Sequence, residues 1–298
     1  MSRPAPHALA AIALLIAACA CFTVLDTTAK YISAWVPLLM ALWFRYAFQA
    51  VATTLVMLPV RGTRLLRTRN LPFQCLRGVL LLVSSLLAFT SLKYMPVGEF
   101  TAIVMIAPLA ITVLAATVLK EKVSALRWLL VAGGFAGTLV IIRPGGEAFN
   151  WTSLLPLGLV GTGAWFQVLT SKMARTEDPV TMHLYTGWVG TLLASLALPF
   201  VWTQVGNSWH WLWLVLMGAM GTIGHFLLIL AYQRAPAAAL APYHYTQIAF
   251  AMLGGWLVFR HVPDRWSLIG MAMIAACGAA GAWLTVRENR SAPEPSPA

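Results

Sequence analysis

Long apolar runs separated by short polar segments extend along nearly the whole chain. The clearest run reaches from Phe100 to Leu119, twenty residues without a charge between Glu99 and Lys120. At about 1.5 Å per residue, a helix of this length crosses a hydrocarbon core about 30 Å thick. The runs are continuous and do not alternate in polarity, which favours membrane helices over a β-barrel.

The pattern predicts ten membrane-spanning helices. Their expected ranges are 8–29, 36–60, 74–93, 98–119, 125–142, 152–171, 181–203, 210–232, 238–259 and 265–286. The stretch from Pro179 to Gln233 is hard to divide, because its 55 residues contain no Asp, Glu, Lys or Arg. The polar residues 204–208 supply a turn that splits it into two helices. The first span also has features of a cleaved leader peptide, but its apolar continuation towards Asp26 favours a retained helix.

Composition changes the picture only by excluding other classes of protein. The chain has 298 residues, of which 60% are hydrophobic and 10% charged, against roughly 45–50% and about 25% in soluble domains. This balance excludes a soluble enzyme, a disordered protein and a disulfide scaffold. The four cysteines have neither metal-ligand nor disulfide spacing, so we expect them to pack as small hydrophobic side chains.

The distribution of positive charge predicts the orientation. The net charge is +11, but Lys and Arg lie between apolar runs and do not cluster on a soluble domain, so we expect no nucleic-acid partner. With both termini on one side, that side carries Arg3, Arg61, Arg64, Arg67, Arg69, Arg77, Lys120, Lys122, Arg127, Lys172, Arg175, Arg234, Arg287 and Arg290. The other side carries only Lys30, Lys93, Arg143, Arg260 and Arg265. This asymmetry predicts a multi-pass protein of a bacterial-type inner membrane with both termini in the cytoplasm.

Recurring residues suggest an internal duplication. Thr28, Lys30 and Pro37 recur 142 residues later as Thr170, Lys172 and Pro179. A unit of five spans is odd in number, so the second copy must enter the membrane inverted, as in many secondary transporters. We therefore predict an all-α integral membrane protein with ten transmembrane helices in two inverted five-helix repeats. The expected division is 1–145 for the first repeat, 146–287 for the second and 288–298 for a disordered cytoplasmic tail.

Several motifs resemble the drug/metabolite transporter superfamily of the ten-span EamA type. In the first half they are residues 94–108 (YMPVGEFTAIVMIAP), 119–122 (LKEK) and 133–144 (GGFAGTLVIIRP). In the second half they are residues 224–225 (GH), 235–236 (AP), 241–247 (APYHYTQ) and 262–264 (VPD). The resemblance implies a carrier of a small organic metabolite, since similar members move riboflavin, S-adenosylmethionine or amino acids in either direction.

One departure from the family pattern concerns acidic residues. The family's acidic residue after the fourth span is present as Glu121, but Arg260 and His261 stand at the corresponding place after the ninth span. A role that needs a carboxylate in both halves is therefore not expected.

The segment from Pro242 to Gln247 is the strongest candidate for substrate binding. Tyr243, His244 and Gln247 give it more polar side chains than a lipid-facing surface tolerates, so at least one face must point into the bundle. His244 and Gln247 share a helix face. The alternative is interhelical hydrogen bonding without a substrate, worth on the order of 1 kcal/mol per contact.

Two charged residues inside predicted spans are candidates for coupling to protons or substrate charge. Asp26 lies near the outer end of the first span, and its alternative role is an ion pair with Lys30 one turn later. Arg45 lies nine residues into the second span; its alternative role is an ion pair with an acid such as Asp26, or a position among aromatic neighbours.

Other candidates lie on the fourth, sixth and eighth spans. Further substrate contacts are expected from His225, Trp165, Gln167 and Met105, although packing alone would also explain such residues. Pro108 and Pro242 are expected to kink their helices, because proline frees a carbonyl that protein or water must satisfy.

The sequence favours a carrier over two other kinds of protein. A membrane-embedded haem protein or enzyme using His225 and His244 is the alternative, and a channel would need a continuous polar lining. No nucleotide-binding loop, metal motif or catalytic motif is present, so we expect a non-enzyme without cofactor or metal. The expected partners are the lipid bilayer and a flat aromatic or amphipathic solute; a homodimer is compatible with the pattern.

Overall fold

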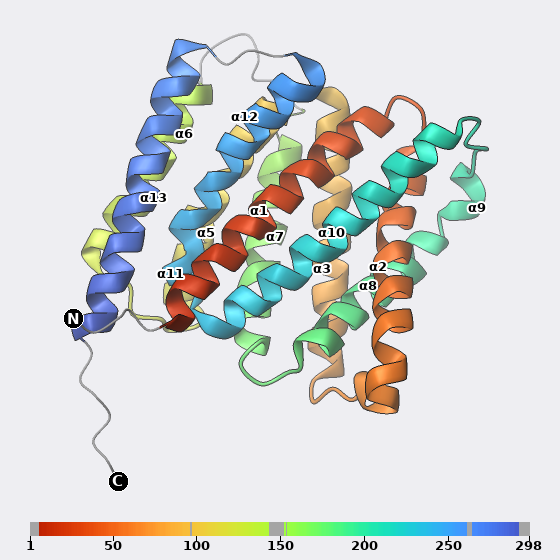
Figure 1. The fold of residues 1–298 in the computed structure, drawn as a ribbon, viewed down its shortest axis with the longest axis horizontal. Coiled ribbons are helices and arrows are strands. Elements are labelled where there is room, and N and C mark those ends of the chain that lie inside the picture. The colour runs from red at the N-terminus through yellow and green to blue at the C-terminus, as the bar shows by residue number, and fades with distance from the viewer. Residues whose placement is uncertain (1–5, 96, 143–151, 153, 261–263, 292–298) are drawn as a thin grey trace.

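The computed structural model describes residues 6–95, 97–142, 152, 154–260 and 264–291. All regular elements in this part of the chain are helical (Figure 1). Five helical segments are long and apolar enough to cross a membrane: Leu9–Ile32, Leu38–Leu66, Leu71–Tyr94, Leu154–Met173 and Ser208–Arg234. Most of the other predicted spans correspond to shorter or interrupted helices, and the tenth corresponds to a helix of 27 residues.

The helices follow the predicted spans in order. The first half contains α1 (Pro6–Ile32), α2 (Leu38–Arg61), η1 (Gly62–Leu66), α3 (Leu71–Tyr94), α4 (Val97–Val104), α5 (Ala107–Thr117) and α6 (Ala125–Ile142). The second contains α7 (Leu154–Met173), α8 (Pro179–Ser195), α9 (Leu198–Val201), α10 (Ser208–Arg234), α11 (Ala237–Leu240), η3 (Ala241–Tyr245), α12 (Thr246–Phe259) and α13 (Arg265–Ser291).

The long uncharged stretch is divided where the polar residues predicted it. Helix α10 begins at Ser208, and the Asn207 side chain caps it by accepting a hydrogen bond from the Trp209 amide at 2.9 Å. At the other end of the chain the structure differs from the prediction, because α13 continues to Ser291, four residues into the expected tail. Residues 292–298 lie outside the described residues.

The helix contacts of the first half are approximately repeated in the second when the two halves are exchanged. Helix α1 packs on α10 as α7 packs on α3, and α1 packs on α12 as α7 packs on α5. Contacts between α2 and α8, and between α6 and α13, join equivalent helices of the two halves. Figure 1 shows α1 and α10 side by side across the middle of the bundle, with α6 and α13 at one edge. The predicted two-repeat architecture therefore places the centre of the molecule at the contact between the repeats.

The fourth and ninth spans are both interrupted near a proline. A turn at Met105 and Ile106 separates α4 from α5, with Pro108 in the first turn of α5. In the ninth span Pro242 lies in the 3₁₀ segment η3 between α11 and α12. Proline lacks the amide hydrogen that a continuing α-helix needs, and it fits the first turn after a break. Interrupted helices at equivalent places in two halves are typical of transporter binding sites.

Glycines bring α2 and α8 into close contact. A Cβ atom added at Gly187 would lie 2.9 Å from the backbone nitrogen of Ala50, and one added at Gly190 would overlap the Tyr46 ring. The two equivalent helices therefore approach backbone to backbone, as small residues allow in membranes. This contact fixes the part of α2 that carries Arg45.

Candidate functional site

A buried polar network centred on Arg45 joins the two repeats. Arg45 is 1% exposed. Its Nη1 donates to Ser85 Oγ at 2.9 Å, and its Nη2 lies 2.7 Å from Nε2 of His225. The Tyr46 hydroxyl lies 2.9 Å from the same Ser85 oxygen. Helices α2, α3 and α10 are thus linked at one point.

The geometry fixes the proton on His225. A guanidinium group donates hydrogen bonds and cannot accept them, so Nε2 of His225 must be the acceptor and the ring proton must be on Nδ1. Of the two alternative roles considered for Arg45, the structure shows no ion pair with Asp26 but does place its Cζ 4.5 Å from the centroid of the Tyr46 ring, an aromatic neighbour. The close approach of α2 to α10 at Gly221, whose Cβ would lie 3.1 Å from Arg45 Nε, directs the guanidinium towards a neutral histidine.

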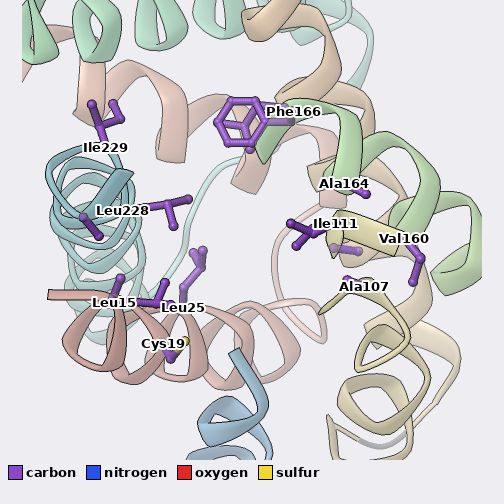
Figure 2. Close-up of a cluster of buried hydrophobic side chains, with 14 of the residues drawn as sticks. Leu15, Cys19, Leu25, Ala107, Ile111, Val160, Ala164, Phe166, Leu228 and Ile229 are labelled. Carbon is purple, nitrogen blue, oxygen red and sulfur yellow. The ribbon is translucent and has the colours of Figure 1, made fainter. Parts of the chain in front are cut away.

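Aromatic rings from both repeats surround His225. The Phe22 ring centroid lies 4.7 Å from that of His225, and the Phe166 centroid lies 5.8 Å away at 87°. Figure 2 shows Phe166 as part of the buried apolar cluster, in which Leu228 of α10 and Ile111 of α5 point towards one another. The centre of the bundle therefore combines flat rings, aliphatic walls and a small number of polar groups.

Arg77 is a buried cation without a carboxylate partner among the described residues. Its side chain is 0% exposed, and its Nε donates to Thr170 Oγ1 at 3.0 Å. Its Nη1 donates at 3.2 Å to Gln74 Oε1 and to the Met182 carbonyl, and its Cζ lies 5.3 Å from the Phe166 centroid. Sequence reasoning missed this residue by counting it with the cytoplasmic-side cations. Its position inside the predicted span 74–93 was the available signal.

Two donors near Phe166 have no protein acceptor. Nδ1 of His225 and Nη2 of Arg77 are buried, and neither has a hydrogen-bond partner in the part of the chain that the structure describes. Burying an unpaired donor costs free energy, and such groups are rare away from functional sites. Acceptor atoms of a ligand would satisfy both donors.

Asp26 faces Gln247 and does not pair with Lys30. Nε2 of Gln247 lies 3.4 Å from Oδ2 of Asp26, and Thr23 Oγ1 donates to the Gln247 carbonyl at 3.4 Å. Lys30 instead donates to two carbonyls at the end of α3, 2.6 Å from that of Leu92 and 3.1 Å from that of Met95. The alternative role of Asp26 as a partner of Lys30 is therefore wrong, because the C-terminus of α3 attracts the ammonium group.

A second polar cluster connects Gln167 with His244. The Tyr232 hydroxyl donates to Oε1 of Gln167 and lies 3.4 Å from Nε2 of His244. Tyr243 is 3% exposed, on the same 3₁₀ segment as His244. Sequence reasoning assigned Tyr232 no role in the site, because its bridging position depends on the packing of α7, α10 and η3.

The remaining candidates lie apart from these clusters. Met105 is buried in a separate apolar cluster with Tyr245, Ile248 and Ile274. Trp165 is 47% exposed. The structure therefore does not bring Met105 or Trp165 together with His225, and their role in substrate binding stays a prediction.

The haem alternative is not favoured by this geometry. Nε2 of His225 lies 2.7 Å from a guanidinium nitrogen, which occupies the lone pair that a haem iron would need. Among the described residues, no three His, Cys, Asp or Glu side chains gather as a metal site would require.

Comparison with known proteins identifies the family. The model of the EamA-like transporter family matches residues 9–143 and 153–282, once in each half. The chain belongs to the EamA-like transporter family. As a member of this family within the drug/metabolite transporter superfamily, it is a membrane transporter for a small metabolite.

Curated relatives of this EamA-like protein include riboflavin transporters and S-adenosylmethionine uptake transporters. A riboflavin transporter of Vibrio cholerae is 30% identical over 85% of this chain and 86% of its own length. A riboflavin transporter of Brucella anthropi is 26% identical over 87% and 94%. An S-adenosylmethionine uptake transporter of Rickettsia conorii is 26% identical over 84% of each chain.

A solved structure shares the fold of this EamA-like protein. A crystal structure with 19% sequence identity superimposes with a TM-score of 0.72, covering 92% of this chain and 99% of the other. This similarity shows the common fold and nothing about the substrate.

Proposed function

We propose that this protein carries a flat, acceptor-rich aromatic metabolite of the riboflavin type across a bacterial inner membrane. One observation carries the proposal: His225, with an unpaired Nδ1 donor, lies between the Phe22 and Phe166 rings where the two repeats meet. A flavin ring system is planar and uncharged, and it carries two carbonyl oxygens and ring nitrogens as acceptors. Stacking on phenylalanine and hydrogen bonding to His225 and Arg77 would fit such a molecule.

The balance of buried charge supports a solute without positive charge. Arg45 and Arg77 are buried near the aromatic rings, and Asp26 is the acid buried in the same spans. A cationic substrate would meet like charge, which costs free energy in a low-dielectric interior. The named riboflavin relatives agree with this preference.

Transport would proceed by alternating access of the two repeats. The interruptions at Pro108 and Pro242 supply points where the fourth and ninth spans can bend. The charge asymmetry supports an orientation with both termini in the cytoplasm. A gradient drives the cycle in this proposal, with Asp26 as the group that takes up a proton and Arg45 as a charge beside the path.

Riboflavin fluorescence gives a direct test of binding. Detergent-purified protein is titrated into riboflavin, and quenching of flavin fluorescence reports stacking. Phe166→Ala is expected to weaken binding about tenfold, through the loss of one aromatic contact and its apolar area. The matched control is Phe200→Ala on α9, whose side chain is 88% exposed. Saturable quenching that Phe166→Ala leaves unchanged would contradict the proposed site.

A second candidate substrate is a cation of the S-adenosylmethionine type. Asp26 is 8% exposed, and its hydrogen bond from Gln247 is long at 3.4 Å, so the carboxylate is available to a substrate ammonium group. If the substrate is of this type, S-adenosylmethionine should raise the melting temperature of the purified protein, because a ligand that binds only the folded state stabilises it. It should not displace riboflavin. Asp26→Asn would abolish that stabilisation while leaving flavin quenching intact.

A further inference from the structure

A basic cavity lies where α2 ends and α8 begins. It has a volume of about 420 Å³, and its lining includes Arg61, Arg64, Arg67, Asp178 and Thr181. Arg61 is neutralised by an ion pair of 2.6 Å with Asp178. The guanidinium groups of Arg64 and Arg67 make no hydrogen bond or ion pair with any other described residue. The cavity therefore holds an excess of positive charge.

The arginine-bearing segment is held in place by hydrogen bonds to α8. Thr181 Oγ1 donates to the Leu65 carbonyl at 3.0 Å, and the Tyr185 hydroxyl donates to the Leu66 carbonyl at 2.9 Å. Glu177, which precedes Asp178 in the chain, is engaged by Thr68 Oγ1 at 3.0 Å and by the Arg69 amide at 2.9 Å. Arg64 and Arg67 thus project from a fixed 3₁₀ turn.

An apolar groove lies next to the basic cavity. It has a volume of about 220 Å³ between α2, α8 and α10, and its lining includes Val56, Met57, Val180, Ile223 and Phe226. Val56 is 61% and Ile223 45% exposed, so the groove opens at the surface of the bundle.

The groove and the cavity are continuous along α2. Val56 of the groove and Val60 of the cavity are four residues apart and share a helix face. Leu65 of the cavity packs in one cluster with Val180 and Met57 of the groove. Charge and hydrophobicity therefore change from one compartment to the other over about one helical turn.

We propose that cavity and groove together bind an anionic phospholipid. The phosphate would lie between Arg64 and Arg67, and one acyl chain would follow Val56, Ile223 and Phe226. The basic end lies on the side that the charge asymmetry assigns to the cytoplasm, at the end of an apolar span, where a headgroup phosphate is located. The Arg61–Asp178 ion pair beside it joins equivalent helices of the two repeats, so the lipid would sit at a contact that alternating access has to change.

The test counts lipids on the full-length protein by native mass spectrometry. Detergent-purified protein is titrated with dioleoyl phosphatidylglycerol, with dioleoyl phosphatidylcholine as the lipid without net charge and inorganic phosphate as the free anion. The wild-type protein is expected to bind phosphatidylglycerol preferentially. Arg64→Gln/Arg67→Gln is expected to weaken that binding about 30-fold, because each of the two basic residues near an anionic lipid contributes about fivefold. Ile223→Trp, which fills the groove, is expected to weaken it as well.

A matched variant separates the site from general charge. Lys122→Gln/Arg234→Gln removes two exposed cations from the same predicted side outside the cavity, and it should bind phosphatidylglycerol like the wild type. Unchanged binding in Arg64→Gln/Arg67→Gln would overturn the proposal, as would equal binding of phosphatidylcholine. If inorganic phosphate alone binds, and Ile223→Trp leaves that binding unchanged, the cavity is a site for a free anion instead. Flavin quenching is measured separately, so failure here leaves the proposed function untouched.

Discussion

At the scale of single residues, two buried arginines are held by neutral partners only. Arg45 links α2, α3 and α10 through Ser85 and His225, and Arg77 links α3 to α7 and α8 through Thr170 and the Met182 carbonyl. Each guanidinium group has one nitrogen without an acceptor among the described residues. A buried cation with such partners contributes little net stability, because desolvation offsets its hydrogen bonds. In the proposed function, the unpaired Nη2 of Arg77 is a donor to the substrate.

We therefore expect Arg77→Met to separate stability from binding. Methionine fills a similar volume without the cost of burying a charge, so the melting temperature should stay within a few degrees of the wild type. Riboflavin binding should weaken about tenfold with the loss of one charged donor. Thermal unfolding in detergent and fluorescence quenching measure the two effects. A large fall in melting temperature with intact binding would make Arg77 a structural residue.

The second prediction at this scale concerns the polar residues of the ninth span. His244→Ala/Gln247→Ala removes the partners of Tyr232 and Asp26, so uptake into proteoliposomes should fall at least about tenfold if both face the substrate. Tyr245→Phe is a suitable control, because its hydroxyl donates to the Val131 carbonyl away from the cluster. Normal transport by the double variant would show that these residues serve packing alone.

At the scale of helices, glycine determines how closely equivalent elements of the two repeats approach. Gly187 of α8 faces the Ala50 backbone of α2, which cannot rotate away as a side chain can. A methyl group added at Gly161 of α7 would have no atom within 4 Å, so that position bears no such constraint.

These two glycines form a matched pair for mutation. Gly187→Ala should destabilise the fold by about 1–3 kcal/mol, because the added methyl group forces the two helices apart. Gly161→Ala should leave stability equal or raise it by up to about 1 kcal/mol, since alanine favours a helix over glycine. Melting temperatures of the purified variants provide the comparison. Equal behaviour of the pair would mean that α2 and α8 do not touch as described.

At the scale of the whole molecule, the orientation of the protein decides on which side of the bilayer the basic cavity and the adjoining ends of α2 and α8 lie. The charge asymmetry predicts that η1 lies in the cytoplasm and that the segment before α10 lies on the opposite side. Thr63 in η1 and Gly206 in the segment before α10 are both exposed.

Cysteine labelling tests this orientation. In a variant without its four native cysteines, Gly206→Cys should react with a membrane-impermeant maleimide in intact cells. Thr63→Cys should react only after the cells are opened. Native-like expression of both variants is checked on the same gel. The reverse labelling pattern would place both termini outside and would overturn the assigned side of the phospholipid site.

The class of protein, the ten spans and the two repeats could be predicted from the amino-acid sequence alone. These follow from properties of contiguous segments, namely the length of an apolar run, the charge of a loop and the offset between similar residues. Phe100–Leu119 is long enough to cross a bilayer whatever its neighbours are. The polar turn before Ser208 was likewise visible without any tertiary contact.

Which polar groups meet depends on the packing of the helices and could not be predicted from the sequence. Arg45 finds His225, 180 residues away, and Asp26 faces Gln247, 221 residues away, where the sequence suggested nearer partners. From the sequence, Arg77 was counted as a loop cation. In the structure it is buried, because α3 packs on α7 and α8. In a membrane nearly every span is apolar, so hydropathy places a helix in the bilayer but does not say which face meets which neighbour. Close contacts set those faces, and with them the candidate site: Gly187 meets the Ala50 backbone, and Gly221 meets the Arg45 side chain.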